Sequence, residues 1–154
     1  MSVSFNTVVL SGDLVPQTLP LVQATWPAVD LTAWRNFVQF FTDQAASRKS
    51  GVHGLRDSAG CFCGVFAGRL DRDLLIGPIL AVDLFTAVDV ANSPRTVRAL
   101  LVAAEARALE LGCAAVRIRL CNGQAELGSR LRTLGLASEI GQFWNEVANM
   151  QSRN

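Results

Sequence analysis

The spacing of hydrophobic and polar residues changes along the chain, and each change marks a new group of predicted elements. A short β-rich run over residues 7–10 comes first, and the turn cluster Ser11-Gly12-Asp13 ends it. Pro16 and Pro20 then bracket a short predicted helix that ends near Trp26. The chain is therefore expected to begin with a strand and a helix.

The second predicted helix carries an apolar stripe at helical spacing. Asp30 suits the N-cap position, because its side chain can accept a hydrogen bond from a backbone N–H of the first turn. We expect this helix over residues 31–47. The stripe consists of Leu31, Trp34, Val38, Phe41 and Ala45.

From Val52 onwards the pattern is that of strands joined by short turns, which predicts an antiparallel meander. The last of these strands is interrupted at Gly77-Pro78. Since proline cannot donate to a strand ladder, this break indicates a bulge or an edge position. The predicted strands cover residues 52–56, 61–70 and 74–88, with polar turns at 57–60 and 71–73.

The strongest helix signal begins at Pro94, a residue that is favoured in a first helical turn. Gly112 is expected to end this helix and Gly135 the next one, because glycine adopts the left-handed conformation found at helix C-termini. The apolar stripe of the first consists of Val97, Leu100, Leu101, Ala104, Ala108 and Leu111. The remaining predicted elements are a strand over 115–120, a helix over 124–134 and short strands around 136–140 and 143–147.

The predicted order is β-α-α-β-β-β-α-β-α-β-β, in a single domain over residues 1–154. A meander followed by a β-α-β crossover gives an α/β (α+β) fold, with a mixed, mostly antiparallel central sheet flanked by helices. Ligands bind to such sheets beyond the strand ends, where neighbouring strands diverge. The expected site therefore lies between strand 74–88, the Pro94 helix and strand 115–120.

Composition narrows the classes of partner. Half of the residues are hydrophobic and 18% are charged, which favours a globular core. A formal net charge of +1 gives no overall field to hold a polyanion, so nucleic acid is not an expected partner. The chain shows neither a secretion signal nor a long apolar run, which predicts a cytoplasmic protein without a membrane partner.

The order of the elements and several local motifs resemble the GNAT superfamily of acetyl-CoA-dependent N-acyltransferases. The likeness spans residues 5–148, and it is the order and spacing of the motifs together that make it specific. The segments that carry it are residues 98–107 with Leu111-Gly112-Cys113 (the cofactor helix and its exit), residues 57–60 before Cys63-Gly64 (a hairpin), Asn122 (the asparagine after the strand) and Leu134-Gly135-Leu136 (the terminal stop).

The resemblance implies that acetyl-CoA, or another acyl-CoA, binds between two diverging strands. Backbone amides at the helix N-terminus would hold its pyrophosphate, with help from the helix dipole. The residues expected to touch the cofactor are Ala87, Val88, Asn92, Ser93, Pro94, Arg95, Thr96, Val97, Arg98 and Asn122.

The phosphate loop departs from the family's motif, which is arginine or glutamine, two residues, glycine, one residue, then glycine or alanine. Asn92 stands at the first position, and Arg95 and Val97 stand where small residues are expected. Two outcomes stay open. These side chains fill the phosphate cradle and binding is lost, or Arg95 supplies a cation while Ser93 and Thr96 supply hydroxyls, and binding is only weakened.

Asp83 and Asp89 are the candidate catalytic residues, because an amine attacks only after it has lost its proton and a carboxylate can take that proton through water. The competing interpretation is that Asp89 begins a turn and that Asp83 is a strand-face charge paired with arginine.

Many family members protonate the leaving thiolate with a tyrosine. This chain has no tyrosine, and the corresponding place falls near Leu131.

For the other candidate residues, a functional and a structural interpretation both stay open. His53 would be either a general base or a polar strand residue. Cys121 would be either a nucleophile or a packing residue, and it has no evident partner. Arg130 and Arg132 approach the nucleotide or form a solvated helix face. The aromatic residues that form the core or line an apolar acceptor pocket are Trp26, Trp34, Phe37, Phe40 and Phe41.

The first hypothesis for function is an N-acetyltransferase that transfers an acetyl or acyl group directly to the amine of a small acceptor. The alternative is a catalytically degenerate GNAT-like domain with a binding or regulatory role, suggested by the altered loop and the missing tyrosine. A third interpretation, an unrelated α/β binding protein, would be favoured by a sheet without diverging central strands. Pairing of the C-terminal strands predicts a homodimer.

Overall fold

The computed structural model describes residues 4–88, 94–139 and 142–146, and its centre is a seven-stranded sheet in the order β1-β2-β3-β4-β5-β7-β6. All neighbouring strands are antiparallel except β4 and β5, which are parallel. The predicted mixed, mostly antiparallel sheet is therefore confirmed. The strands are β1 (Asn6–Val9), β2 (Gly51–Arg56), β3 (Phe62–Asp73), β4 (Gly77–Ala87), β5 (Ala115–Arg119), β6 (Ala137–Glu139) and β7 (Gln142–Glu146).

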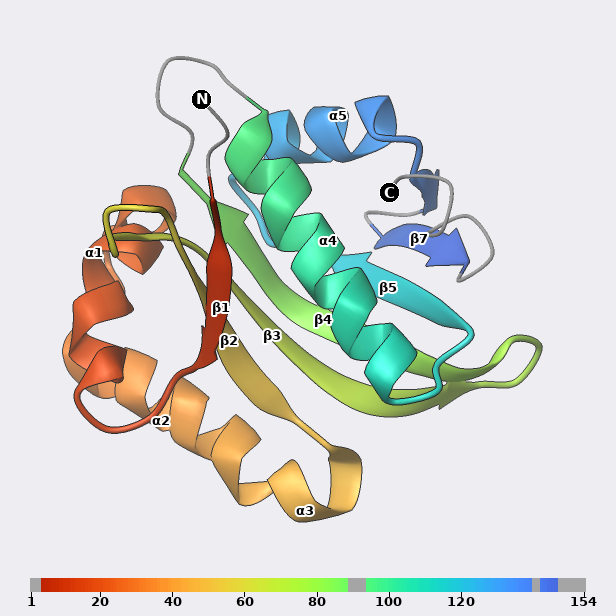
Figure 1. The fold of residues 1–154 in the computed structure, drawn as a ribbon, viewed down its shortest axis with the longest axis horizontal. Helices are drawn as coiled ribbons and strands as arrows, with labels where there is room; N and C mark the ends of the chain where they lie inside the picture. The colour runs from red at the N-terminus through yellow and green to blue at the C-terminus, as the bar shows by residue number, and fades with distance from the viewer. Residues whose placement is uncertain (1–3, 89–93, 140–141, 147–154) are drawn as a thin grey trace.

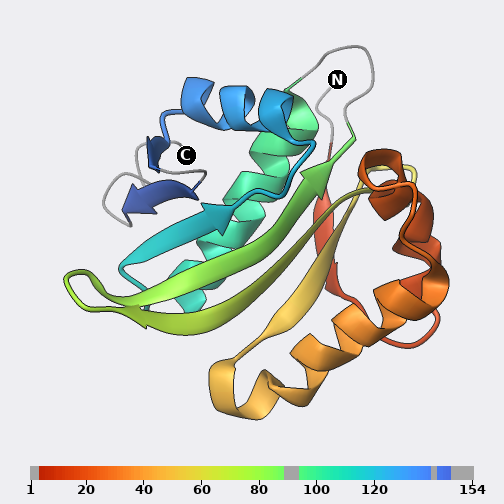
Figure 2. The ribbon, with the colours of Figure 1, turned by 180° about the vertical axis from the view of Figure 1, so that it is seen from behind.

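Helices pack on both faces of the sheet (Figures 1 and 2). On one face, two helices cover β2, β3 and the end of β4. On the other face, a long helix crosses β3, β4 and β5, and a shorter one contacts β7. The bounds are α1 (Leu14–Thr25), α2 (Leu31–Asp43) and α3 (Ala45–Arg48) on the first side, and α4 (Arg95–Glu110) and α5 (Ala125–Thr133) on the second.

Each face has its own hydrophobic core, because side chains of β3 alternate between them. Val65 and Ala67 are buried against α1 and α2, while Phe66 is buried against α4. On the first face the helices stop short of β5 and β7, so this part of the sheet has no helical cover (Figure 2). We call it the open face.

The predicted helix ends follow local signals and are confirmed. Asp30 caps α2, with its side chain accepting from Ala33 N at 2.8 Å. Gly112 and Gly135 follow α4 and α5 with φ of 72° and 96°. At both helices the backbone N–H of the glycine and that of the next residue turn back to carbonyls of the last turn, which ends the helix.

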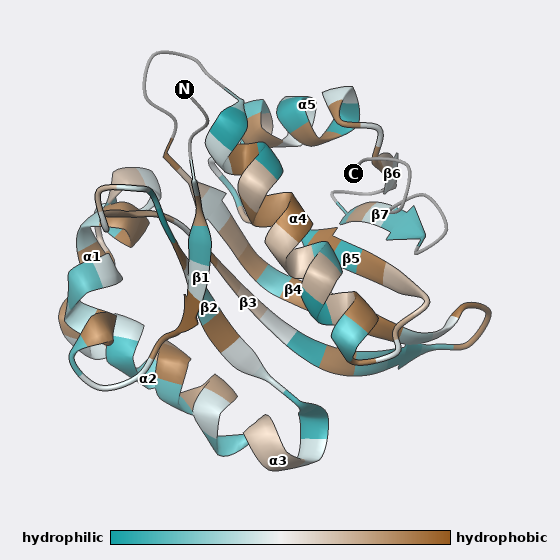
Figure 3. Cartoon of the chain, viewed as in Figure 1, coloured by the Kyte–Doolittle hydropathy of each residue, from teal (hydrophilic) through white to brown (hydrophobic). Residues whose placement is uncertain are grey.

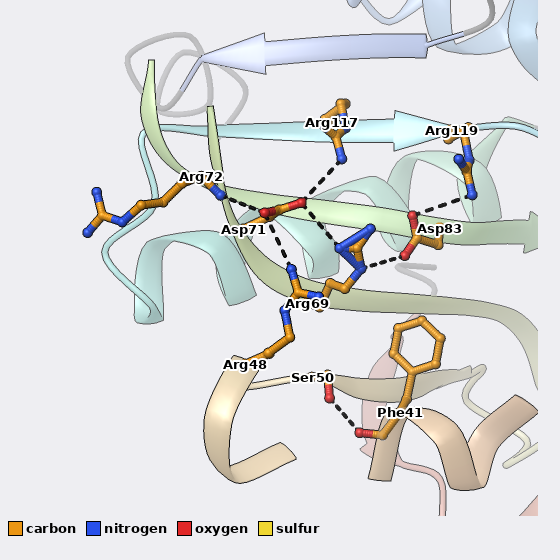
Figure 4. A network of polar contacts seen from close by, with 9 residues as sticks. All are labelled: Phe41, Arg48, Ser50, Arg69, Asp71, Arg72, Asp83, Arg117 and Arg119. Carbon is orange, nitrogen blue, oxygen red and sulfur yellow. Dashed lines mark hydrogen bonds and ion pairs between the residues drawn. The ribbon is translucent and has the colours of Figure 1, made fainter. Parts of the chain in front are cut away.

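The helical region between residues 14 and 48 differs from the prediction. Both prolines lie inside α1 rather than beside it: Pro16 is in the first turn, where no N–H is needed, and Pro20 lies in the helix interior. The helix expected over 31–47 ends at Asp43, and α3 follows as a separate turn. This turn brings Ser50 back to donate to the carbonyl of Phe41 (Figure 4).

The turn between β3 and β4 was also predicted wrongly. Asp73 belongs to β3 and β4 begins at Gly77, so Leu74 and Leu75 form the turn, with 97% and 92% of their surfaces exposed (Figure 3). Asp73 Oδ1 accepts from the N–H groups of Leu75 and Ile76 at 2.9 Å each, and Gly77 has φ of 98°. Aspartate and glycine therefore set this turn, although both leucines are apolar.

The bulge lies at Asp83 and not at Pro78. Val82 pairs with Gly68 and Leu84 with Ala67, which leaves Asp83 without a partner on β3. β4 is a central strand, so the predicted edge position at Pro78 is wrong as well. Pro78 is tolerated because only its carbonyl is needed: it accepts from Ala114 N at 2.8 Å before the ladder with β5 begins.

No helix among the described residues is both long enough and apolar enough to cross a lipid bilayer.

Candidate functional site

The bulge marks the point at which β4 and β5 separate. Their parallel pairing covers only Ile79–Val82 against Ala115–Ile118, while β4 continues to Ala87 beside β3 alone. Val88 N donates to Cys63 O on β3 at 2.9 Å. Along a strand, the backbone N–H and C=O groups of successive residues point alternately to the two neighbouring strands. Since those of Val88 point to β3, those of Phe85 and Ala87 point away from it. We call the resulting gap beside residues 83–87 of β4 the opening.

The side chain of Gln124 bridges the opening. Gln124 is only 6% exposed, and its Nε2 donates to Phe85 O at 2.7 Å. Its Oε1 accepts from Cys121 N at 2.9 Å, just beyond the end of β5. One carboxamide therefore takes the place of a peptide group between the diverging strands. Sequence reasoning missed this residue, although its place at the start of a predicted helix, where side chains bond backbone groups, was a usable signal.

A cavity of about 390 Å³ adjoins this bridge. The ends of α1 and β4 and the first turns of α4 and α5 line it. Three of the predicted cofactor residues, Ala87, Val88 and Val97, are among its walls. The structure thus brings part of the predicted cofactor site together at the opening.

The predicted cofactor residues at the start of α4 differ in their exposure to solvent. Pro94 is the N-cap, Thr96 and Val97 are buried, and Arg95 and Arg98 are exposed. Both arginines line a larger groove of about 880 Å³, between α4 and β1. The first turn of α4 contains no acidic residue, so these guanidinium groups add to the positive end of the helix dipole.

Of four further predicted residues, three lie outside the described residues and Asn122 lies within them. Asp89, Asn92 and Ser93 lie outside them, so the open question about the phosphate loop stays open. Asn122 is exposed and its backbone carbonyl accepts from Trp26 Nε1 at 3.2 Å. Its contact with a cofactor stays a prediction.

Asp83, the other predicted catalytic residue, faces the open face at the bulge. Its Oδ2 accepts from Arg69 Nε at 2.9 Å, and its Oδ1 lies 3.9 Å from a terminal nitrogen of Arg119 (Figure 4). The structure therefore places Asp83 as a strand-face charge paired with arginine, beside the opening. Its role in proton transfer stays a prediction.

Four residues of the predicted aromatic cluster divide between core and pocket, and the fifth, Phe40, is exposed. Trp34 and Phe41 are buried, and the Trp34 indole donates to Val15 O and Thr18 Oγ1. Trp26 and Phe37 line a small apolar cavity of about 220 Å³ between α1, α2 and β4. This cavity lies on the α1–α2 side of β4.

Neither His53 nor Cys121 has a catalytic partner in the described part of the chain. His53, the one histidine, stacks on Phe66 at 4.8 Å and is two strands away from β4. Cys121 is exposed at the end of β5. Leu131, at the place expected for the family's tyrosine, is fully buried in the core.

The protein is expected to lose stability as the pH falls from about 6.5 to about 4. Burial, and then the charge of Arg107, lower the pKa of His53 from 6.5 to about 4, against a smaller opposite effect of Glu110. Between these values the unfolded chain binds the proton and the folded chain does not, which costs the folded state up to about 3 kcal/mol. Urea unfolding at several pH values measures this slope. His53→Gln should flatten it, and an unchanged slope in that variant would contradict the assignment.

Solved structures resemble this fold, although no protein-family model and no curated protein sequence matches the chain. An acetyltransferase of the GNAT family from Staphylococcus aureus Mu50 has a TM-score of 0.68 at 7% identity, over 94% of this chain and 99% of that one. Spermidine N-acetyltransferase from Vibrio cholerae, in complex with CoA and spermine, has a TM-score of 0.68 at 6% identity, over 96% and 98%. Glucosamine-6-phosphate N-acetyltransferase from Arabidopsis thaliana has a TM-score of 0.63 at 8% identity, over 88% and 93%.

The chain therefore has the fold of the GNAT acetyltransferases, and the expected resemblance is confirmed at the level of the fold. Identities of 6–8% do not transfer a substrate, and the neighbours' own acceptors differ in charge. The acceptor must be sought in the residues of this chain.

Proposed function

We propose that this protein is an N-acyltransferase that uses acetyl-CoA, or another acyl-CoA, to acylate the amine of a small acceptor by direct transfer. The observation that carries the proposal is the opening: a central strand that has lost its strand partner on one side, a bulge and an adjoining cavity, in a fold shared with acetyltransferases. A ligand with an extended, amide-bearing arm fits such a strand edge by adding to it as another strand would.

The residues around the opening fit an acyl-CoA. Phe85 and Ala87 direct backbone groups at the place where an extended arm would lie, and the arginines at the start of α4 attract its phosphates. When bound, the cofactor supplies an activated acyl group as a thioester. The protein's part is to hold the arm, to present the acceptor from the other side of the sheet and to accept the amine's proton.

Transfer forms one bond and breaks one. The neutral amine nitrogen would attack the thioester carbonyl, the C–N bond would form and the C–S bond would break, so that the sulfur leaves with the electron pair as thiolate and then takes up the proton that the new amide nitrogen releases. The proton of the ammonium form passes through water toward Asp83, which lies at the bulge. A thiol with a pKa of about 8.5 leaves as thiolate without a strong acid, so the buried Leu131 does not prevent the reaction.

A catalytically degenerate GNAT-like domain is the second candidate function. Two observations favour it: the Gln124 bridge occupies the carbonyl of Phe85, and the carboxylate of Asp83 is held by Arg69. A degenerate domain would bind a CoA thioester without turning it over, or would not bind it.

Binding and turnover separate these functions. In a calorimeter, acetyl-CoA and CoA are expected to bind, and the double variant Arg95→Glu/Arg98→Glu is expected to weaken binding about tenfold or more, because two cations beside the phosphates become anions. Arg35→Glu, at an exposed position of α2, is the matched control and should bind like the parent. An amine screen with thiol release as the readout follows. Binding without turnover of any amine would support the degenerate domain, and absence of binding at millimolar ligand would refute the acyltransferase.

A further inference from the structure

The open face carries a connected network of charged side chains next to the opening (Figure 4). Asp71 and Asp83 are its two acceptors. Asp71 lies 3.2 Å from Arg69, 3.4 Å from Arg48 and 3.7 Å from Arg117. The groups come from β3, β4, β5 and α3, so the network exists only in the folded sheet.

Positive charge is in excess in this network. Its ion pairs join four guanidinium groups to two carboxylates, which leaves a surplus of two positive charges. Arg117 also lies over the ring of Trp144, 5.7 Å from its centroid. Glu146, an acidic residue of β7, pairs with Ala115 at the opposite end of β5 and does not offset this surplus.

Of the four arginines in this network, Arg119 has the longest ion-pair contact and the most exposed side chain. Among the described side chains its one ion-pair partner is Asp83, at 3.9 Å, and 62% of its side chain is exposed. By contrast, Arg69 is 19% exposed and contacts both carboxylates at 3.2 Å or less. The guanidinium of Arg119 therefore lies beside Asp83 with one long contact, and its donors face solvent.

The position of this pair relative to the opening is specific. Val82 and Ile118 form the last backbone pair between β4 and β5, and Asp83 and Arg119 are the residues that directly follow. Asp83 Oδ2 is committed to Arg69, whereas Oδ1 has only the long contact to Arg119. An acceptor that approaches the opening from the open face meets a carboxylate oxygen and a guanidinium side by side.

We infer that the acceptor is an amine that also carries a carboxylate or phosphate group. Arg119 binds the anion, because a guanidinium presents paired donors that match these groups. Asp83 Oδ1 contacts the amine through the water that carries its proton and orients it toward the opening. A polycationic acceptor is disfavoured by the surplus of arginines. The inference rests on the proposed acyltransferase function.

Matched probes test the anion without requiring the natural acceptor. With CoA present, the side-chain N–H signals of arginine are followed by NMR while N-acetylglycine, which carries the carboxylate, or the uncharged N-acetylglycinamide is added. We expect the carboxylate to bind about tenfold more tightly or better and to shift the Arg119 signal. Arg119→Gln should remove the preference, and Arg35→Gln, an exposed arginine on α2, should keep it. Equal binding, no binding of either probe, or a preference unaffected by Arg119→Gln would overturn the inference.

Turnover distinguishes failure of this inference from failure of the proposed function. Glucosamine 6-phosphate and glycine are compared with partners that lack the anionic group, glucosamine and glycinamide, and with spermidine, using acetyl-CoA as donor. A higher kcat/KM for the anionic members, lost in Arg119→Gln with CoA affinity unchanged, supports the inference. Turnover of spermidine or of the amines without an anionic group, and of no others, overturns it and leaves the acyltransferase intact. Failure to bind CoA overturns both.

Discussion

Replacing Ala87 with tryptophan is expected to abolish binding of acetyl-CoA and to leave the fold intact. Ala87 ends β4 and lines the cavity of about 390 Å³ at the opening. An indole at this place occupies the volume that the cofactor arm needs, so affinity should fall about a hundredfold or more. Calorimetry measures the affinity, and thermal unfolding of the variant checks the fold.

The matched control is Ala106→Trp, because Ala106 lines the larger groove between α4 and β1. This substitution adds the same side chain in the groove instead of at the opening, and it should leave the affinity for acetyl-CoA unchanged. The opposite pattern, with loss of binding only in Ala106→Trp, would place the cofactor in the groove and refute the assignment of the opening. The pair of variants thus decides between the cavity at the opening and the groove that Arg95 and Arg98 line.

Gln124→Leu is expected to destabilise the protein by about 2 kcal/mol, because a side chain of similar size removes both halves of the bridge. Phe85 O and Cys121 N each lose their partner, and Phe85 is fully buried. For a chain of this length such a loss lowers Tm by about 5 °C. Differential scanning calorimetry without ligand measures this change.

Gln39→Leu provides the control for Gln124→Leu. Gln39 is exposed on α2 and donates to Asp43 Oδ1 at 2.7 Å, so its loss should change stability by less than about 0.5 kcal/mol. If Gln124→Leu unfolds at the same temperature as the parent, the carboxamide does not hold β4 and α5 together, and the bridge has no structural role.

Sequence reasoning located the opening in general terms and missed the residue that bridges it. It placed the site between strand 74–88, the Pro94 helix and strand 115–120. The cavity at the opening is lined by β4 and α4 as expected, but its remaining walls come from α1 and α5 and not from β5. Sequence reasoning named Asn122 after β5 as a cofactor residue, which stays a prediction, and it did not name Gln124, whose side chain bridges the opening. The sequence does not distinguish Asn122 from Gln124 in this respect, because it does not show which of two amide side chains is buried.

What the sequence determined by itself is local. The cap at Asp30 and the stops at Gly112 and Gly135 depend on hydrogen bonds within a few residues and on one backbone angle, so the residue type is enough to place them. Apolar periodicity likewise placed α4, α5 and the short C-terminal strands, to within about two residues.

Only the tertiary structure decided the features that make the site. The bulge at Asp83 depends on its register against β3, and the Gln124 bridge joins residues 39 positions apart. The charge surplus around Arg119 requires β3, β4, β5 and α3 to meet on one face. Strand register and the approach of distant side chains are set by packing of the whole sheet between its two helical layers, and no local pattern in the chain encodes them.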